Sequence, residues 1–148
     1  GSLALGTPHT YSFRIGQKLG MDYFNKGFAG TALLEKEITI LPGETVLIHT
    51  GLQMEIPENL VGLIYARSGL ASKRGLAPAN KVGVVDSDYR GEVMVALHNH
   101  SETAQTVAGG ERIAQMGIMP FIRGEFAEAE SLSLTDRGEG GFGSTGKM

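Results

Sequence analysis

The chain contains no cysteine and no tryptophan, and aromatic residues make up only 7% of its 148 residues. Without cysteine there is no disulfide scaffold, no thiol nucleophile and no thiolate metal site. The net charge of −3 provides no basic surface for nucleic acid. The apolar runs are too short for a membrane span, and no signal peptide is visible. We therefore expect one cytoplasmic or otherwise intracellular domain with a real core and with neither a nucleic-acid nor a membrane partner.

The chain instead contains many short apolar runs, which recur about every ten residues between Gly, Pro, Asn or Asp. This spacing predicts an all-β sandwich or barrel rather than βαβ units. One short helix is expected after Arg67, with Ser68 as its N-cap. The predicted strands cover residues 37–41, 45–56, 60–65, 81–85, 93–99, 103–107 and 112–121.

The last twelve residues include five glycines, together with Arg137, Phe142, Ser144 and Thr145. Glycine backbone can wrap closely around an anion, arginine and hydroxyl groups donate to phosphate, and a phenyl ring can stack on a base. The segment is therefore a candidate lid over a nucleotide, although a disordered glycine-rich tail has the same composition. It is not a P-loop, because Met148 follows Lys147 where that motif needs a hydroxyl residue and a helix.

Three further segments carry groups that could do chemistry. Residues 67–71 (RSGLA) place an arginine, a hydroxyl and free N–H groups at a helix start, which suits a phosphate or an ordinary capped turn equally. Residues 83–92 (GVVDSDYRGE) form a hairpin in which Asp86 or Asp88 could bind metal or act as a base, or simply favour the turn. Residues 110–116 (GERIAQM) offer Gln115, or only a structural salt bridge and a buried amide.

Together these segments resemble four of the five ordered motifs of the trimeric deoxyuridine triphosphatases (dUTPases), over residues 37–148. The resemblance implies a jelly-roll-like distorted barrel or sandwich and a homotrimer with active sites shared between subunits. Residues 1–136 would form the β domain, with 1–10 flexible and partly a tag, and 137–148 would be the lid. The implied reaction is Mg²⁺-assisted attack of water on the α-phosphate of dUTP, which yields dUMP and pyrophosphate. This reaction limits uracil in DNA and supplies dUMP for thymidylate synthesis.

The resemblance also implies a role for each matching residue. Asp86 would orient and activate the water, Tyr89 would pack beneath the deoxyribose, and Asn80 with the backbone of Val82–Val85 would read the uracil edge. The remaining implied substrate contacts are phosphate and water ligands (Arg67, Ser68, Gly69, Gln115), cavity walls (Val84, Val85, Met94) and the lid (Arg137, Phe142, Gly143, Ser144, Thr145).

The first family motif, normally Ala-Gly-x-Asp-Leu, is irregular in this chain. One register uses Ala29–Leu33, which keeps the spacing from a strand over residues 11–18 but places Ala32 where the acid belongs. The other uses Gly20–Tyr23, which keeps Asp22 as a carboxylate near the hydrated Mg²⁺ but requires an insertion. Two alternatives to a dUTPase therefore stay open: a dCTP deaminase or bifunctional deaminase–dUTPase on the same fold, and a catalytically weak nucleotide-binding protein.

Overall fold

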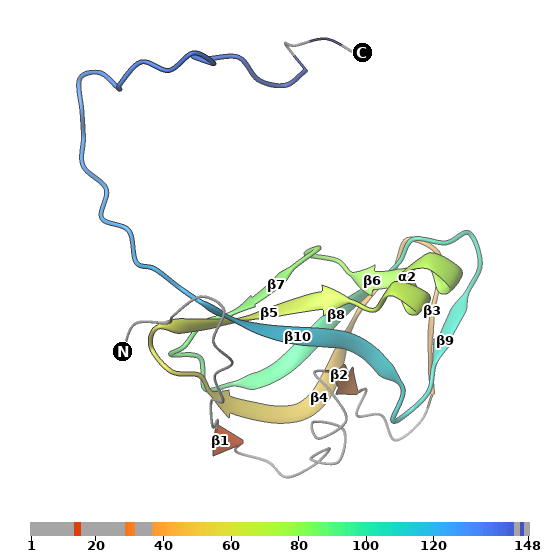
Figure 1. Ribbon diagram of the computed structural model, residues 1–148. Coiled ribbons are helices and arrows are strands. Elements are labelled where there is room, and N and C mark those ends of the chain that lie inside the picture. Colours follow the sequence, from red (N-terminus) through yellow and green to blue (C-terminus); the bar gives the residue numbers. More distant parts are fainter. Residues whose placement is uncertain (1–13, 16–28, 32–36, 144–145, 147–148) are drawn as a thin grey trace.

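Most of the chain forms a β domain from which the C-terminal segment extends (Figure 1). The structure is a computed structural model that describes residues 14–15, 29–31, 37–143 and 146. Helix α2 spans Ser68–Arg74. The strands are β1 (Arg14–Ile15), β2 (Ala29–Thr31), β3 (Ile38–Ile40), β4 (Thr45–Glu55), β5 (Leu60–Ala66), β6 (Leu76–Pro78), β7 (Gly83–Val85), β8 (Glu92–Asn99), β9 (Gln105–Val107) and β10 (Arg112–Pro120).

The strands form two four-stranded sheets and a two-stranded ribbon. One sheet has the order β1-β4-β8-β6, the other has the order β2-β10-β5-β7, and β3 pairs with β9. The strand pairs are antiparallel, and many join segments that are distant in the sequence, as in the pairing of Thr45 with His98. Such non-local pairing is typical of sandwich and jelly-roll folds.

The core lies between the inward faces of the two sheets. Alternate residues of β8 show the pattern most clearly, because Val93, Val95, Leu97 and Asn99 are buried while the residues between them are half-buried. This period of two is the signature of a strand with one face in the core. The other fully buried large side chains come from both sheets and the ribbon: Ile40, Ile48, Leu60, Leu76, Val107 and Ile113.

Within the part of the chain that the structure describes, the predicted all-β fold with one short helix is confirmed, and the expected strands match within two residues. Two details differ. Arg67, not Ser68, is the N-cap residue, and no side chain caps the helix. Strands β2 and β6 were not predicted, because each has only three residues and β6 ends at Pro78 directly after the helix. No helix within the described residues is long and apolar enough to cross a membrane.

Candidate active site

The predicted hairpin over residues 83–92 is wrong in its strand pairing, because β7 pairs with β5 whereas β8 pairs with β4 and β6, so the turn that carries Asp86 connects the two sheets. We keep the name hairpin for this segment. Its first strand, β7, pairs with β5 so that Val85 lies opposite Gly62, and its second strand is β8. The backbone N–H of Tyr89 donates to the carbonyl of Asp86 (3.1 Å), and the Tyr89 hydroxyl donates to the carbonyl of Glu92 (2.8 Å). These two bonds close the turn and hold the Tyr89 ring back over it. The Asp86 side chain is left exposed to solvent.

A cavity of about 240 Å³ lies beside this hairpin. Its walls are mainly apolar, and its polar groups come from a few side chains, as is usual for a small-molecule site. Six of the predicted site residues line it: Asn80, Val84, Val85, Asp86, Tyr89 and Met94. The structure therefore brings the proposed base, sugar-binding and uracil-binding residues together.

The cavity also has walls that sequence reasoning missed. Leu47 of β4 and Ala96 of β8 line it, as do Ile64 of β5 and Pro78 of β6. None of these residues belongs to a local motif, because each reaches the cavity only through strand pairing. The one usable signal was the alternation in β8, which places Met94 and Ala96 on the face away from the core.

The loop before β7 presents Asn80 through an unusual backbone conformation. Lys81 has a φ of 67°, in the left-handed region that non-glycine residues rarely occupy. Its backbone N–H donates to the carbonyl of Pro78 (3.1 Å), and that of Val82 donates to the carbonyl of Asn80 (2.7 Å). The Lys81 ammonium donates to Nε2 of His100 (3.1 Å), which ties the loop to the end of β8. The Asn80 amide remains exposed at the cavity edge.

Glu92 lines the cavity and anchors a β-bulge in the neighbouring strand. The pairing of β4 with β8 shifts between His49 and Leu52, and Gly51 in the bulge has a φ of 71°. The Glu92 carboxylate accepts from Nδ1 of His49 (2.9 Å) and from the backbone N–H of Gly51 (3.0 Å). The hydrogen bond from His49, followed by that from Gly51, holds the pKa of Glu92 below its ordinary value.

The predicted phosphate ligands form a second group outside this cavity. Gln115 of β10 donates from its side-chain amide to the carbonyl of Ala66 (2.8 Å), directly before the helix. Gln115 is exposed, so the alternative of a buried amide is wrong. A Cβ added to Gly69 would meet nothing within 4 Å, so the surface there is open. Arg67, Ser68, Gly69 and Gln115 do not line the cavity of the same chain.

The predicted lid residues that the structure describes lie away from the β domain (Figure 1). Phe142 is fully exposed (115%), and the Arg137 Nε donates to the carbonyl of Gly140 (2.6 Å) within the same segment. Ser144 and Thr145 lie outside the described residues, as do Asp22 and Ala32. The lid therefore does not cover the cavity of its own chain, and the question of the first-motif register is not addressed by the described residues.

A bound metal would need ligands beyond those this cavity supplies. Within the described residues, no group of three or more His, Asp or Glu side chains could hold a metal ion. The exposed carboxylate of Asp86 nevertheless fits a hydrated Mg²⁺ that takes its other ligands from phosphate and water. The chemistry of the donors is thus compatible with the expected cofactor.

Fold and cavity together define an all-β protein with a small-ligand site at the junction of two sheets. A family model described as dUTPase matches residues 23–146. The chain is 54% identical over 128 residues to the deoxyuridine 5'-triphosphate nucleotidohydrolase of Desulfitobacterium hafniense, covering 84% of this chain and 85% of that protein. The chain belongs to the dUTPase family, as the motifs predicted.

Two further comparisons agree with this assignment. The chain is 45% identical over 139 residues to the deoxyuridine 5'-triphosphate nucleotidohydrolase of Acinetobacter baylyi, covering 90% of this chain and 93% of that protein. The dUTPase of Staphylococcus bacteriophage 80alpha, solved with dUPNHPP, superimposes with a TM-score of 0.79 at 25% identity, covering 93% of this chain and all of that one. The jelly-roll-like class expected from the sequence is thereby confirmed.

Proposed function

We propose that this protein is a dUTP diphosphatase, which hydrolyses dUTP to dUMP and pyrophosphate. The observation that carries the proposal is the position of Asp86, whose exposed carboxylate lines a cavity shared with Tyr89 and Asn80. Relatives that cover most of the chain are named for this activity. The same reaction would limit uracil in DNA and supply dUMP for thymidylate synthesis.

The cavity is suited to a uracil deoxynucleoside. The side-chain amide of Asn80 can donate and accept hydrogen bonds at the edge of uracil. The donors and acceptors along this edge differ from those of cytosine. Val84 and Met94 line the cavity and would form the apolar walls that exclude a methyl group on the base. Tyr89, held by its hydrogen bond to the Glu92 carbonyl, would pack under the deoxyribose and exclude a 2′-hydroxyl.

The reaction is attack by one water on the α-phosphorus. Asp86 is well placed to orient this water and accept its proton, because its carboxylate is exposed at the cavity rim. Arg67 with the open surface at Ser68 and Gly69 would bind the phosphates, and Gln115 would hold the water. Mg²⁺, when bound, would neutralise charge on the phosphate oxygens, and Asp22 is the candidate carboxylate near it.

Within one chain, the cavity that Asp86 lines and the phosphate-binding group at the helix start are separate, and this separation supports a homotrimer. A complete site needs the hairpin cavity, the helix-start group and the lid, and one chain does not bring them together. Sites shared between three copies would meet this requirement, with the lid of one copy closing over the nucleotide of another. Closure would exclude bulk water and strengthen each contact with the phosphates.

The proposal is tested by pyrophosphate release from dUTP, compared with dCTP, dTTP and UTP in the presence of Mg²⁺. A strong preference for dUTP is expected, whereas ammonia release from dCTP would favour a deaminase. Equal rates with all four nucleotides would refute the proposal. An Ala32→Asp variant adds a test of the first motif: a large gain in rate would identify position 32 as the missing acid, and no gain would favour Asp22.

Substitution of Asp86 tests the proposed base directly. Asp86→Asn should lower kcat by roughly a hundredfold or more while the affinity for the dUPNHPP analogue changes little, since the carboxylate acts mainly in the transition state. Asp88→Asn is the matched control, because Asp88 lies in the same turn but does not line the cavity. Equal losses in the two variants would contradict the assignment to Asp86.

A further inference from the structure

An ion pair outside the cavity connects the end of helix α2 to the segment that leads into β10. Arg74, the last helical residue, donates from Nη1 to the Glu111 carboxylate. The same guanidinium donates from Nη2 to the carbonyl of Thr106 and from Nε to Oε1 of Gln105 (3.4 Å). The predicted structural salt bridge at Glu111 is thus confirmed, but its partner comes from the helix rather than from Arg112 next to it.

Glu111 is itself held on the β10 side. Its second carboxylate oxygen accepts from the backbone N–H of Ala108 (3.0 Å), which closes the turn before β10. Both partners are partly shielded from water, with side-chain exposures of 33% for Arg74 and 26% for Glu111. A shielded, multiply hydrogen-bonded arginine–carboxylate pair is stronger and more directional than an exposed pair.

Helix α2 lies between two paired strands, because Ala66 before it pairs with Ala114 of β10 and Leu76 after it pairs with Asn99 of β8. It spans seven residues, and Leu70 is its one buried side chain. At its other end, Gln115 of β10 donates to the carbonyl of Ala66. Both ends of the segment 66–74 are therefore tied to β10 or to the turn before it. Through these contacts, β10 and the turn before it support the helix start that carries Arg67, Ser68 and Gly69.

We propose that Arg74 and Glu111 are positioning residues that set the phosphate-binding group, Arg67 to Gly69 with Gln115, for the reaction. This inference rests on the proposed hydrolysis of dUTP. In this proposal neither residue contacts the nucleotide, and both act by fixing the position of helix α2. Because the guanidinium donates in three directions, a lysine at position 74 keeps the charge but cannot reproduce the geometry.

The test uses Arg74→Lys, Arg74→Gln, Glu111→Gln and the double variant Arg74→Gln/Glu111→Gln, each as the full-length protein. We expect kcat/KM for dUTP to fall roughly ten- to hundredfold in the single glutamine variants, because misplacement of phosphate ligands costs rate steeply. The affinity for dUMP, which relies on the hairpin cavity, should stay at the wild-type value. Arg74→Lys should be intermediate, and the double variant should lose no more than either single variant.

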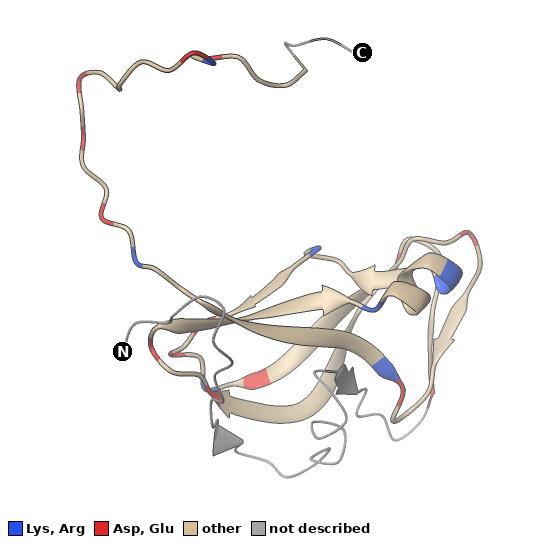
Figure 2. Cartoon of the chain, in the orientation of Figure 1, with Lys and Arg blue, Asp and Glu red and all other residues tan. Residues whose placement is uncertain are grey.

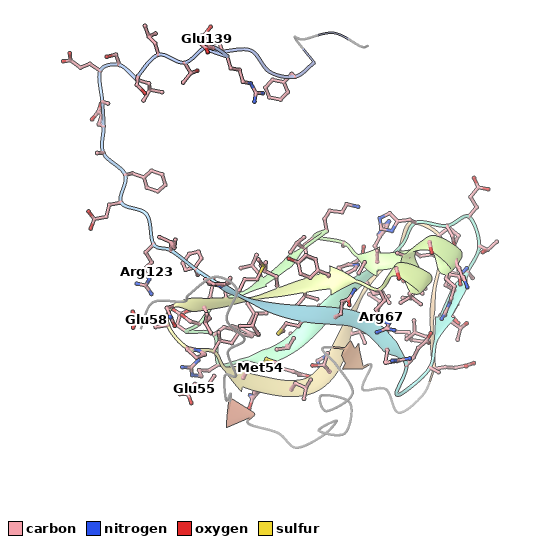
Figure 3. The ribbon with its side chains drawn as sticks, viewed as in Figure 1. Met54, Glu55, Glu58, Arg67, Arg123 and Glu139 are labelled. Atoms are coloured by element: carbon pink, nitrogen blue, oxygen red, sulfur yellow. The ribbon has the colours of Figure 1, made fainter. Side chains whose placement is uncertain are left out.

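The matched control is Glu58→Gln, which breaks an exposed pair with Arg123 (3.6 Å; 84% and 72% exposed). Figure 3 shows this pair at the opposite end of the domain from Arg67. The control should keep kcat/KM unchanged. Wild-type kcat/KM in Arg74→Lys and Glu111→Gln, additive losses in the double variant, or parallel loss of dUMP affinity would each overturn the inference. Absence of turnover in the wild-type protein would instead refute the proposed function.

Discussion

At the scale of single residues, Asn99 has the most complete set of hydrogen bonds in the core. Its side chain is fully buried (0% exposed) and donates from Nδ2 to the carbonyls of Ile40 and Thr103, both at 2.8 Å. Its Oδ1 accepts from the backbone N–H and the hydroxyl of Ser101. A buried amide with every donor and acceptor satisfied connects β8, the ribbon strand β3 and the loop between β8 and β9.

Removal of this amide should be costly. Asn99→Ala leaves several buried backbone groups without their side-chain partner, and we expect it to lower the free energy of unfolding by about 3 kcal/mol. Denaturant unfolding at one protein concentration measures the loss. Asn59→Ala, at an exposed position in the turn between β4 and β5, should change little. A loss at Asn99 no larger than at Asn59 would contradict this account.

Gly91 leaves room for the side chain of Tyr89. A Cβ at position 91 would lie 2.5 Å from the Tyr89 hydroxyl oxygen and 2.6 Å from Cζ, so only glycine lets the ring fold back over the turn. Gly91→Ala should displace the ring and lower the preference for dUTP over UTP by roughly tenfold, equivalent to about 1.4 kcal/mol. The ratio of kcat/KM for the two nucleotides measures the effect.

The control for this variant is Gly124→Ala, where an added Cβ would meet nothing within 4 Å. It should leave the nucleotide preference unchanged. If Gly91→Ala lowers stability but keeps the wild-type preference, Tyr89 does not set the selectivity against the 2′-hydroxyl.

At the scale of elements, the bulge in β4 makes stability depend on the ionisation of Glu92. The pKa of Glu92 is lowered in the folded protein, chiefly by the hydrogen bond from His49 and then by that from Gly51. A group with a lowered folded pKa contributes stability above its unfolded pKa and loses that contribution as the pH falls through the folded value. Glu92 should therefore stabilise the fold at neutral pH and cease to do so in acid.

Glu92→Gln tests this dependence. The difference in unfolding free energy between wild type and variant should be largest at neutral pH and shrink as the pH falls below the ordinary pKa of glutamate. Chemical denaturation across this pH range measures the difference, with Glu102→Gln as an exposed control on the loop between β8 and β9. A difference that does not vary with pH would mean that the carboxylate charge plays no part.

Elements differ in how far the sequence predicts them. Strands such as β8 follow from the alternation of apolar residues, since one face must be buried. The N-cap of α2 could not be predicted in this way, because capping depends on where the chain enters the helix. The short strand β6 could not be predicted either, because three residues are too few to show a period. The bulge at Thr50 and Gly51 is likewise invisible locally, since it depends on contacts with Glu92 and Val93 across the sheet.

At the scale of the whole molecule, the segment after β10 stands out. Phe121 and Arg123 still contact Asn59 and Glu58 of the domain, but the segment beyond them runs away from the domain, and acidic residues are spread along it (Figure 2). Its apolar side chains Phe126, Leu132 and Leu134 are almost fully exposed in the single chain. Exposure of several large apolar groups is a sign of a missing contact. In the proposed trimer, a second copy would supply that contact.

A mixing experiment tests the shared site. A protein cut before Arg137 should have low activity but keep its assembly, because the lid is not part of the β domain. Mixed trimers of this truncated protein with full-length Asp86→Asn should regain activity, since one copy then supplies the carboxylate and another the lid. Activity no higher than the sum of the separate proteins, under conditions where subunits exchange, would argue against lids that cross between copies. Loss of assembly on truncation would contradict the lid assignment.

By itself, the sequence determined the class of fold, the family and the local group around Asp86 and Tyr89. These depend on strand periodicity and on motifs within a dozen residues, where neighbouring side chains share one turn. Only the tertiary structure decided that Leu47 and Ala96 wall the cavity, that Arg74 reaches Glu111, and that the helix-start group lies outside the cavity of its own chain. Such contacts join residues far apart in the chain, and their geometry comes from strand pairing and sheet packing, which no local pattern encodes.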